Sequence, residues 1–237
     1  MINQHSFVEL ESKRCQEEYR RRAREIDPDL YAPWQPGEIL MMNERERIAA
    51  IMLRTIGRFP VIGDRCLELG FGRLGWLGRL ISWGVRESDL YGVELDRERA
   101  MVAMSALPSA NLRVGNAVRL PWGDELFDLI VVSTLFSSIL DARVQDAISK
   151  EIDRVLLPGG VVLWYDAAVN NPKNRNLVGL SRSDIARLFP SYELYLRRAT
   201  LAPPIARRLA RASWSLATAA SAIPFLRTHL VGTLVKP

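Results

Sequence analysis

Apolar runs alternate with helix-forming stretches through the middle of the chain. The longest run, 127–133, is almost unbroken, as in a strand that is buried on both faces of a sheet. Runs of the same kind predict further strands, and periodic stretches predict helices between them. The strands are expected at 65–69, 90–95, 111–114 and 161–166, and the helices at 74–83, 97–106 and 142–156. Strands that alternate with helices favour right-handed crossovers, so the pattern predicts an α/β fold with a doubly wound, parallel sheet.

Both ends of the chain add elements to this core. Helices are predicted at 10–26 and 44–56, separated by a segment rich in proline. Closing strands are predicted at 192–196 and 229–235. A helical insertion bounded by prolines, 203–224, lies between these two strands.

The turn after the first predicted strand carries the most informative chemistry. Over residues 66–75 it reads Cys-Leu-Glu-Leu-Gly-Phe-Gly-Arg-Leu-Gly. Gly70, Gly72 and Gly75 give the spacing G-x-G-x-x-G, which lets the backbone approach a ligand at the carboxyl end of a strand. Glu94 follows about twenty residues later, at the end of the second predicted strand, where a carboxylate can accept hydrogen bonds from both hydroxyls of a ribose.

The acid inside this turn, Glu68, bears on the identity of the ligand. A pyrophosphate is disfavoured beside a buried carboxylate, so Glu68 argues against a dinucleotide and for a ligand with positive charge. S-adenosylmethionine (AdoMet), with its ammonium and sulfonium groups, meets that description. Nicotinamide-dependent oxidoreductases use the same glycines, and on the turn alone this alternative stays open.

Further landmarks lie downstream, each beside a predicted strand. They are Asn116, Leu120-Pro121-Trp122 before Phe127-Asp128, and the segment 154–160, which ends in Pro-Gly-Gly. At these residues and at the glycine turn, the chain resembles the class I AdoMet-dependent methyltransferases, in the branch that includes ubiquinone- and menaquinone-type enzymes. The resemblance covers residues 60–166. One departure is Leu74, which stands where the family usually has a third glycine.

The resemblance implies a Rossmann-like, seven-stranded sheet that is mostly parallel with an antiparallel last strand. It also implies an N-terminal helical lid, 1–58, and an AdoMet-binding methyltransferase domain, 59–237. The cofactor residues that it implies are Glu68, Gly70, Gly72, Gly75, Glu94, Leu95, Asn116, Ala117 and Ser133. Glu68, the glycine turn and Ser133 would line the methionine part. Glu94 would bind the ribose, and Asn116 with Ala117 would meet the adenine.

Methyl transfer mainly requires an aligned nucleophile and the exclusion of water. A hydroxyl acceptor also benefits from a general base, which should project from the carboxyl end of the fourth or fifth strand. Asp166 is the candidate base, with a loop-capping acid as the alternative role. The candidate acceptor residues are Tyr31, Trp34, Phe136, Asn170 and Asn171.

The net charge of +5 gathers at the two ends of the chain, and no acid follows Glu193. A basic surface can meet nucleic acid, an anionic membrane or an anionic substrate, and a solvated helix face is an equally valid interpretation. No aromatic-and-basic RNA-binding signature is present. In the insertion 203–224, Trp214 lies among arginines. This pattern is typical of contact with an anionic membrane, or of a Trp packed on a neighbouring lid.

The two cysteines, Cys15 and Cys66, can build neither a disulfide framework nor a metal cluster. They favour a reducing cytoplasm, with a peripheral position at the inner face of the membrane if the insertion binds lipid. The uncharged stretch 212–226 is too short and too weakly apolar to span a bilayer.

Together these observations predict methyl transfer from AdoMet to an oxygen of a small-molecule or glycan acceptor, with S-adenosylhomocysteine as the product. Segments 137–141, 164–172 and 201–204 resemble methyltransferases of bacterial polysaccharide-type biosynthesis, which suggests a sugar hydroxyl. Two alternatives are a nicotinamide-dependent oxidoreductase and a non-catalytic protein with an AdoMet-type fold, in which Leu74 impairs the turn. The oligomeric state is left open.

Overall fold

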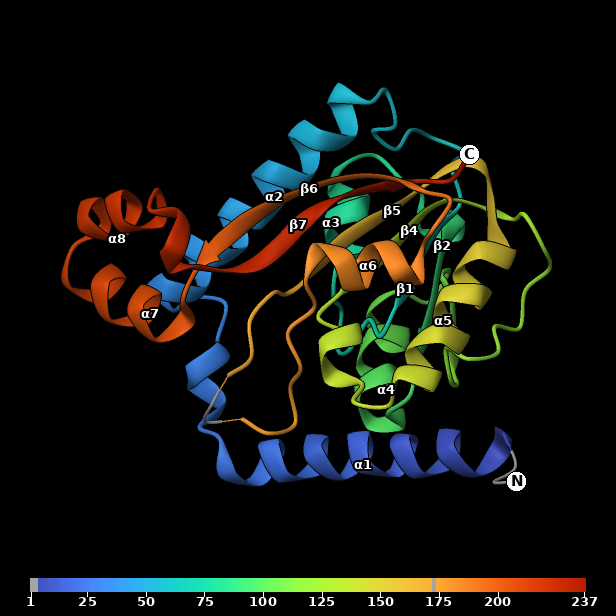
Figure 1. The fold of residues 1–237 in the computed structure, drawn as a ribbon, viewed down its shortest axis with the longest axis horizontal. Helices are drawn as coiled ribbons and strands as arrows, with labels where there is room; N and C mark the ends of the chain where they lie inside the picture. The colour runs from blue at the N-terminus through green and yellow to red at the C-terminus, as the bar shows by residue number, and fades with distance from the viewer. Residues whose placement is uncertain (1–3, 172–173) are drawn as a thin grey trace.

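The computed structural model describes residues 4–171 and 174–237. A seven-stranded sheet in the order β3-β2-β1-β4-β5-β7-β6 forms its centre, with helices on both faces (Figure 1). The strands are β1 (Cys66–Leu69), β2 (Leu90–Glu94), β3 (Asn111–Val114), β4 (Phe127–Ser133), β5 (Leu156–Ala167), β6 (Glu193–Leu201) and β7 (Arg227–Val235). Strands β1 to β5 are parallel, and β7 is antiparallel to both β5 and β6. The predicted fold class is therefore confirmed.

Longer helices and short 3-10 turns connect the strands. The helices are α1 (Gln4–Glu25), α2 (Pro36–Thr55), α3 (Leu77–Ser82), α4 (Arg97–Ala106), α5 (Ala142–Val155), α6 (Arg182–Leu188), α7 (Pro203–Ala212) and α8 (Trp214–Ser221). The 3-10 turns are η1 (Pro28–Tyr31), η2 (Glu87–Asp89), η3 (Phe136–Ser138) and η4 (Pro224–Leu226).

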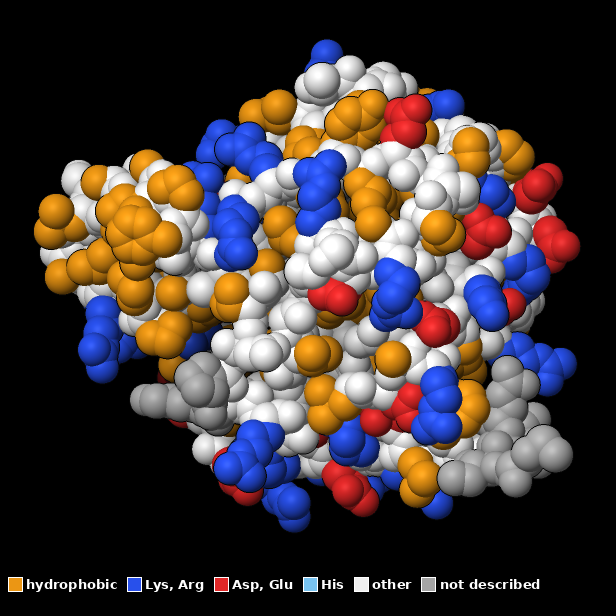
Figure 2. Space-filling view, in the orientation of Figure 1, with side chains coloured by type: hydrophobic (Ala, Val, Ile, Leu, Met, Phe, Trp, Pro, Cys, Tyr) orange, Lys and Arg blue, Asp and Glu red, His pale blue; other side chains and the backbone are white. Residues whose placement is uncertain are grey.

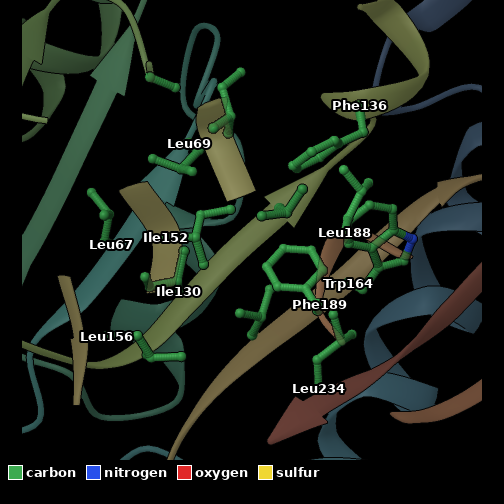
Figure 3. Packing of buried hydrophobic residues seen from close by; sticks show 14 of the residues in the cluster. Leu67, Leu69, Ile130, Phe136, Ile152, Leu156, Trp164, Leu188, Phe189 and Leu234 are labelled. Carbon is green, nitrogen blue, oxygen red and sulfur yellow. The ribbon is translucent and has the colours of Figure 1, made fainter. Parts of the chain in front are cut away.

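Each face of the sheet buries its own apolar cluster. On one face, α5 and α6 cover β4 and β5, and Phe136, Trp164 and Phe189 meet with ring centroids 5.0 to 6.3 Å apart (Figure 3). On the other face, α2, α3 and α4 cover β1 and β2 with residues such as Leu53 and Leu80. Because both faces are covered, the central strands are apolar throughout rather than alternating, as their sequences predicted.

Helix α2 is longer than the predicted 44–56 because it begins at Pro36. Proline fits the first helical position, where its missing N–H is not needed and its fixed φ suits a helix. Ile48, Ala49 and Leu53 of α2 are fully buried against the sheet. Helix α2 is thus part of the packed core, while α1 runs along the edge of the molecule (Figure 1) and packs on the core cluster through Phe7 and Val8. The domain boundary at residue 58 stays a prediction.

The insertion differs from the single helix predicted over 203–224. Ser213 adopts an extended conformation, φ −161° and ψ 119°, which ends α7, and its hydroxyl accepts a hydrogen bond from the N–H of Leu216 at 3.3 Å to begin α8. Serine is a preferred N-cap, so the break has a local cause. Strands β6 and β7 are longer than predicted and carry the helix pair at their far end (Figure 1).

Candidate functional site

The candidate site lies where the carboxyl ends of β1, β2 and β4 meet. Strand β1 is central, and the chain crosses to β2 on one side of it and to β4 on the other. Such a reversal of strand order opens a crevice at the carboxyl ends of the strands, which is where ligands bind in open α/β sheets. The turn that follows β1 and the tip of β2 therefore form the floor of the site.

The three glycines of the turn all adopt left-handed backbone conformations, with φ of 71° at Gly70, 60° at Gly72 and 52° at Gly75. A side chain would be strained in this region of φ. It would also meet neighbours, because a Cβ at Gly72 would lie 2.5 Å from the Arg99 guanidinium and one at Gly75 would collide with the Glu68 carboxylate. The glycine spacing read from the sequence is therefore required by the path of this turn.

Glu68 is hydrogen-bonded to the backbone at the end of this turn. Its Oε2 accepts hydrogen bonds from the N–H groups of Trp76 at 2.7 Å and Leu77 at 3.1 Å, where α3 begins. Burial raises the pKa of this carboxyl to about 8. The structure thus gives Glu68 a role in shaping the turn and starting α3. Its predicted contact with the methionine part of AdoMet stays a prediction.

Glu94 links β2 to the same turn. One oxygen of its carboxylate accepts the N–H of Gly72 at 2.7 Å, and the other accepts the N–H of Asp96 at 2.9 Å. The side chain is buried and lines a small cavity. Each carboxylate oxygen can accept more than one hydrogen bond, so Glu94 can hold the turn and still receive a ribose hydroxyl.

That cavity, of about 50 Å³, lies between the strand tips and α1. Five of the nine predicted cofactor residues line it: Gly70, Glu94, Leu95, Asn116 and Ala117. The other four, Glu68, Gly72, Gly75 and Ser133, do not line it. Pockets for small molecules usually measure about 300–1,000 Å³, so a nucleoside needs more room than α1 leaves here.

Helix α1 is bound to the polar groups along this crevice. The side-chain amide of Asn116 donates to the hydroxyl of Ser12 at 2.8 Å. The Arg14 guanidinium donates to the carbonyl of Ser138 at 2.5 Å, and the N–H of Leu140 donates to Glu11 at 2.6 Å. The Asn116 amide, which was expected to meet adenine, is therefore satisfied by α1 in this conformation.

A second cluster, which the sequence did not predict, lies at the carboxyl end of β5. The Arg45 guanidinium of α2 lies over the rings of Trp76 and Tyr165, 5.1 and 5.4 Å from their centroids. Tyr165 in turn stacks on His229 with the centroids 4.9 Å apart. Burial and the Arg45 charge lower the pKa of His229 to about 4, so its ring is neutral at pH 7. The Arg45 Nε is buried and has no hydrogen-bond partner among the described residues.

Two strained threonines flank Tyr165. Thr134 and Thr200 have φ of 52° and 63°, which is unusual for β-branched residues. The N–H of Thr134 donates to the Tyr165 carbonyl at 2.7 Å, and the Tyr165 hydroxyl lies 2.9 Å from the Thr200 hydroxyl. Strain of this kind costs about 1–3 kcal/mol per residue and gathers at functional sites. We therefore treat the end of β5 as a candidate second part of the site.

Asp166 directly follows Tyr165 in the sequence, and its side chain is fully buried. Its carboxylate accepts hydrogen bonds from the N–H groups of Ser137 at 3.1 Å and Ala167 at 2.8 Å, and burial raises its pKa to about 6. It does not line the cavity. These contacts favour the alternative role, a carboxylate that caps η3, while general-base catalysis stays a prediction.

The predicted acceptor residues do not gather around one pocket. Phe136 is fully buried and packs on Trp164 in the core, and its assignment to the acceptor site stays a prediction. Tyr31 and Trp34 are exposed. Asn170 accepts the N–H of Gly179 at 2.7 Å. Asn171 accepts the N–H of Asn174 through its backbone carbonyl at 2.9 Å. For the last four residues, acceptor binding stays a prediction.

The fold and the site define a domain of the AdoMet-binding type, with a glycine turn at a strand switch point and an acid at the tip of β2. Residues 67–164 match the family model described as a methyltransferase domain. This segment is a methyltransferase domain, which supports the resemblance to the class I AdoMet-dependent methyltransferases that the sequence indicated, and AdoMet is the cofactor that this class uses.

Curated relatives include the demethylmenaquinone methyltransferase of Mycobacterium tuberculosis, which is 28% identical over 144 residues. The match covers 54% of this chain and 59% of that relative, so less than two thirds of the relative's length is spanned.

Solved structures share the fold at low identity. A SAM-dependent methyltransferase from Archaeoglobus fulgidus has a TM-score of 0.59 at 13% identity, over 84% of this chain and 97% of that chain. The [4+2]-cyclase SpnF also has a TM-score of 0.59, at 15% identity and over 81% of each chain. Because a cyclase shares it, the fold by itself does not specify the reaction.

Proposed function

We propose that this protein transfers the methyl group of AdoMet to an oxygen atom of a small-molecule or glycan acceptor. The observation that carries the proposal is the pairing of Glu94 with Gly72 beside a cavity lined by Asn116 and Ala117. A carboxylate that can accept from ribose hydroxyls, an amide that can meet adenine and a glycine turn that lets the backbone approach form the set of groups that an adenosine requires.

AdoMet supplies an activated methyl group, so the protein's own residues have mainly to bind, orient and exclude water. Glu94 and Asn116 would orient the nucleoside, and α1 would cover it as a lid. The Glu68 carboxylate, held at the start of α3, keeps the turn closed beneath the cofactor. Exclusion of water by α1 would protect the reaction from hydrolysis.

The acceptor belongs at the end of β5 in this proposal, where Arg45, Tyr165 and His229 are stacked. A guanidinium next to an acceptor hydroxyl favours loss of the hydroxyl proton, because it stabilises the developing oxyanion. The name of the mycobacterial relatives supports an acceptor of small-molecule size. The resemblance of segments 137–141 and 201–204 to polysaccharide-type enzymes supports a sugar hydroxyl.

A cytoplasmic enzyme at the inner face of a membrane completes the proposal. Within residues 4–171 and 174–237, every helix is too short or too polar to cross a bilayer. Contact with the membrane would therefore have to come from a surface.

Titration calorimetry tests the proposal by comparing AdoMet, S-adenosylhomocysteine and NADH. We expect the first two to bind and NADH not to bind. Glu94→Ala should weaken AdoMet binding by roughly 10-fold or more, because a carboxylate bonded to a ligand hydroxyl contributes about 1.5–3 kcal/mol. Glu98→Ala, which changes an exposed acid on α4, is the matched control.

The remaining outcomes separate the alternatives. Binding of NADH in place of AdoMet would support an oxidoreductase. Absence of binding by both AdoMet and S-adenosylhomocysteine would support a non-catalytic protein. If AdoMet binds, mass spectrometry of acceptor mixtures tests whether a methyl group reaches oxygen.

A further inference from the structure

Strands β6 and β7 carry α7, α8 and η4 at one end of the molecule, on the left in Figure 1. We call residues 203–226 the tip. Large apolar side chains of the tip face solvent: Phe225 is 83% exposed, Leu216 60% and Trp214 47%. Figure 2 shows hydrophobic side chains gathered over this end of the molecule, with Lys and Arg side chains beside them. Apolar patches of this kind mark interaction surfaces on soluble proteins.

An ordinary helix pair in water buries its large apolar side chains, but in the tip three of them are exposed. Its small residues, Ala206, Ala210 and Ala217, are the buried ones and pack with Leu40 and Met41 of α2. Ile205, Leu209 and Leu226 pack partly against the same cluster. Trp214, Leu216 and Phe225 face solvent instead, although burying them would remove more apolar area from water. Nearly half of the surface of Trp214 is exposed, so a large part of this ring is available to a partner outside the chain. The exposure of these three side chains therefore favours an apolar partner.

Positive charge surrounds these apolar residues. Arg208 and Arg211 of α7 are exposed, as are Arg197 and Arg198 of β6. No Asp or Glu occurs between residue 194 and the end of the sequence. Two acids of α2 that meet this end of the molecule are paired, since Glu38 binds Arg207 at 2.8 Å and Glu44 lies 3.8 Å from Arg227.

Trp34 extends the apolar surface from a different part of the chain. The Arg211 guanidinium donates to the side chain of Gln35 at 3.0 Å, which places the neighbouring Trp34 beside the last turn of α7. Trp34 is 67% exposed. Two exposed tryptophans next to arginines are typical of a protein surface that sits at the level of lipid headgroups.

We propose that the tip docks on an anionic lipid bilayer, with Trp214, Leu216 and Phe225 entering the interface and the arginines meeting lipid phosphates. Charge complementarity selects this occupant, since an arginine near an anionic membrane strengthens binding by about five-fold. A second copy of the chain would bring two positive tips together. A bilayer also accepts protruding side chains without needing a complementary pocket.

Docking would fix the position of the site relative to the membrane. Helix α2 packs on the tip through Leu40 and Met41 and carries Arg45 in the second cluster. In this respect the inference rests on the proposed function, because it would bring lipid-borne acceptors to an AdoMet-dependent site. Vesicle binding is measured without AdoMet, so the failure of either proposal is distinguishable from the failure of the other.

Co-sedimentation of the full chain with vesicles tests the proposal. We expect binding to phosphatidylglycerol–phosphatidylcholine vesicles and at least about five-fold weaker binding to phosphatidylcholine alone. Phe225→Ser and Trp214→Ser should each weaken binding to the anionic vesicles by roughly 5- to 10-fold. Ile62→Ser, which changes a 70% exposed residue on the loop after α2, should bind as the wild type does.

Charge reversal provides a second, independent variant. Arg208→Glu should weaken binding to the anionic vesicles by more than five-fold and lower its salt sensitivity, whereas Arg119→Glu, which changes an exposed arginine outside the tip, should have a small effect. Circular dichroism confirms that each variant is folded.

The proposal is overturned if the wild type does not bind anionic vesicles, or if the tip variants and the controls bind equally. A dimer in solution that Phe225→Ser dissociates would also overturn it, by making a second copy the occupant.

Discussion

The Gly72 amide donates a hydrogen bond to the Glu94 carboxylate over 2.7 Å, which ties the tip of β2 to the turn that follows β1. The second carboxylate oxygen receives the N–H of Asp96, so both oxygens are oriented before any ligand arrives. A carboxylate whose orientation is already fixed loses little side-chain entropy when it binds a ligand. If Glu94 binds the ribose as proposed, this contact would join the stability of the turn to the binding of the nucleoside.

Glu94→Gln tests this coupling. A glutamine has one acceptor and one donor at its end, so its NH₂ group would oppose the N–H of either Gly72 or Asp96. We expect AdoMet affinity to fall by about 10-fold and the free energy of unfolding by about 1–3 kcal/mol. Calorimetry and urea denaturation measure the two effects, with Glu98→Gln as control. A loss of stability with unchanged affinity would remove Glu94 from the ligand site.

Glu68→Gln is expected to change how stability depends on pH. Burial raises the pKa of the folded-state carboxyl from 4.5 to about 8, so between these values the folded chain holds a proton that the unfolded chain releases. This contribution is complete below pH 4.5 and is lost as the pH rises through 8. The wild type should therefore lose stability across this window.

The glutamine variant keeps the contacts but not the titration. Both backbone donors, Trp76 and Leu77, act on a single oxygen of Glu68, which an amide oxygen can replace. We expect its unfolding free energy to fall less than that of the wild type between about pH 5 and about pH 8 in denaturant titrations. Equal slopes in the two proteins would show that Glu68 does not have a raised pKa.

If a nucleoside binds in the cavity as proposed, α1 would withdraw to admit it, because about 50 Å³ is free beneath this helix. Ser12→Ala removes the partner of the Asn116 amide. Loss of one hydrogen bond of about 1 kcal/mol should raise the population of the open state roughly 5-fold, and the observed AdoMet association rate with it. Stopped-flow fluorescence measures this rate. Lys13→Ala, at an exposed position of α1, should leave it unchanged, and an unchanged rate in Ser12→Ala would argue against a lid.

Asp166→Asn distinguishes a general base from a capping carboxylate. The side chain is fully buried and accepts from Ser137 and Ala167, so we expect the free energy of unfolding to fall by about 1–3 kcal/mol, while turnover changes only a few-fold. Urea denaturation and a methyl-transfer assay at saturating AdoMet measure these quantities. A folded variant that binds AdoMet normally and has lost turnover would restore the general-base role.

Features encoded by residues that are close together in the sequence were easier to predict than features that depend on contacts between distant segments. The glycine turn was predictable because Gly70, Gly72 and Gly75 and the apolar strand before them are adjacent in sequence, and their left-handed φ values leave few alternatives. Helix α6 was missed although its capping box, Ser181 with Asp184, is also a local signal.

Other features have no local signal. Arg45, Tyr165 and His229 come from α2, β5 and β7, and nothing in any one segment shows that they stack. Phe136 is a candidate acceptor residue from the sequence, whereas in the structure its ring points into the core toward Trp164 (Figure 3). The direction of a side chain after a strand depends on tertiary packing, which spacing does not encode.

The stacked cluster at β5 gives the most direct measurement of the second half of the site. Burial lowers the pKa of His229 first, and the Arg45 charge lowers it further. Arg45→Met keeps the apolar stem and removes the charge, so the pKa of His229 should rise from about 4 but stay below its ordinary value of 6.5 because burial persists.

The chain has two histidines, so NMR titration of the imidazole signals can follow His229 by itself once His5→Gln assigns the pair. Arg47→Met, which changes an exposed arginine on the same helix, is the control and should leave the pKa of His229 unchanged. A His229 pKa that does not move in Arg45→Met would show that the guanidinium does not lie over this cluster in solution, and the acceptor site would then have to be sought elsewhere along the strand ends.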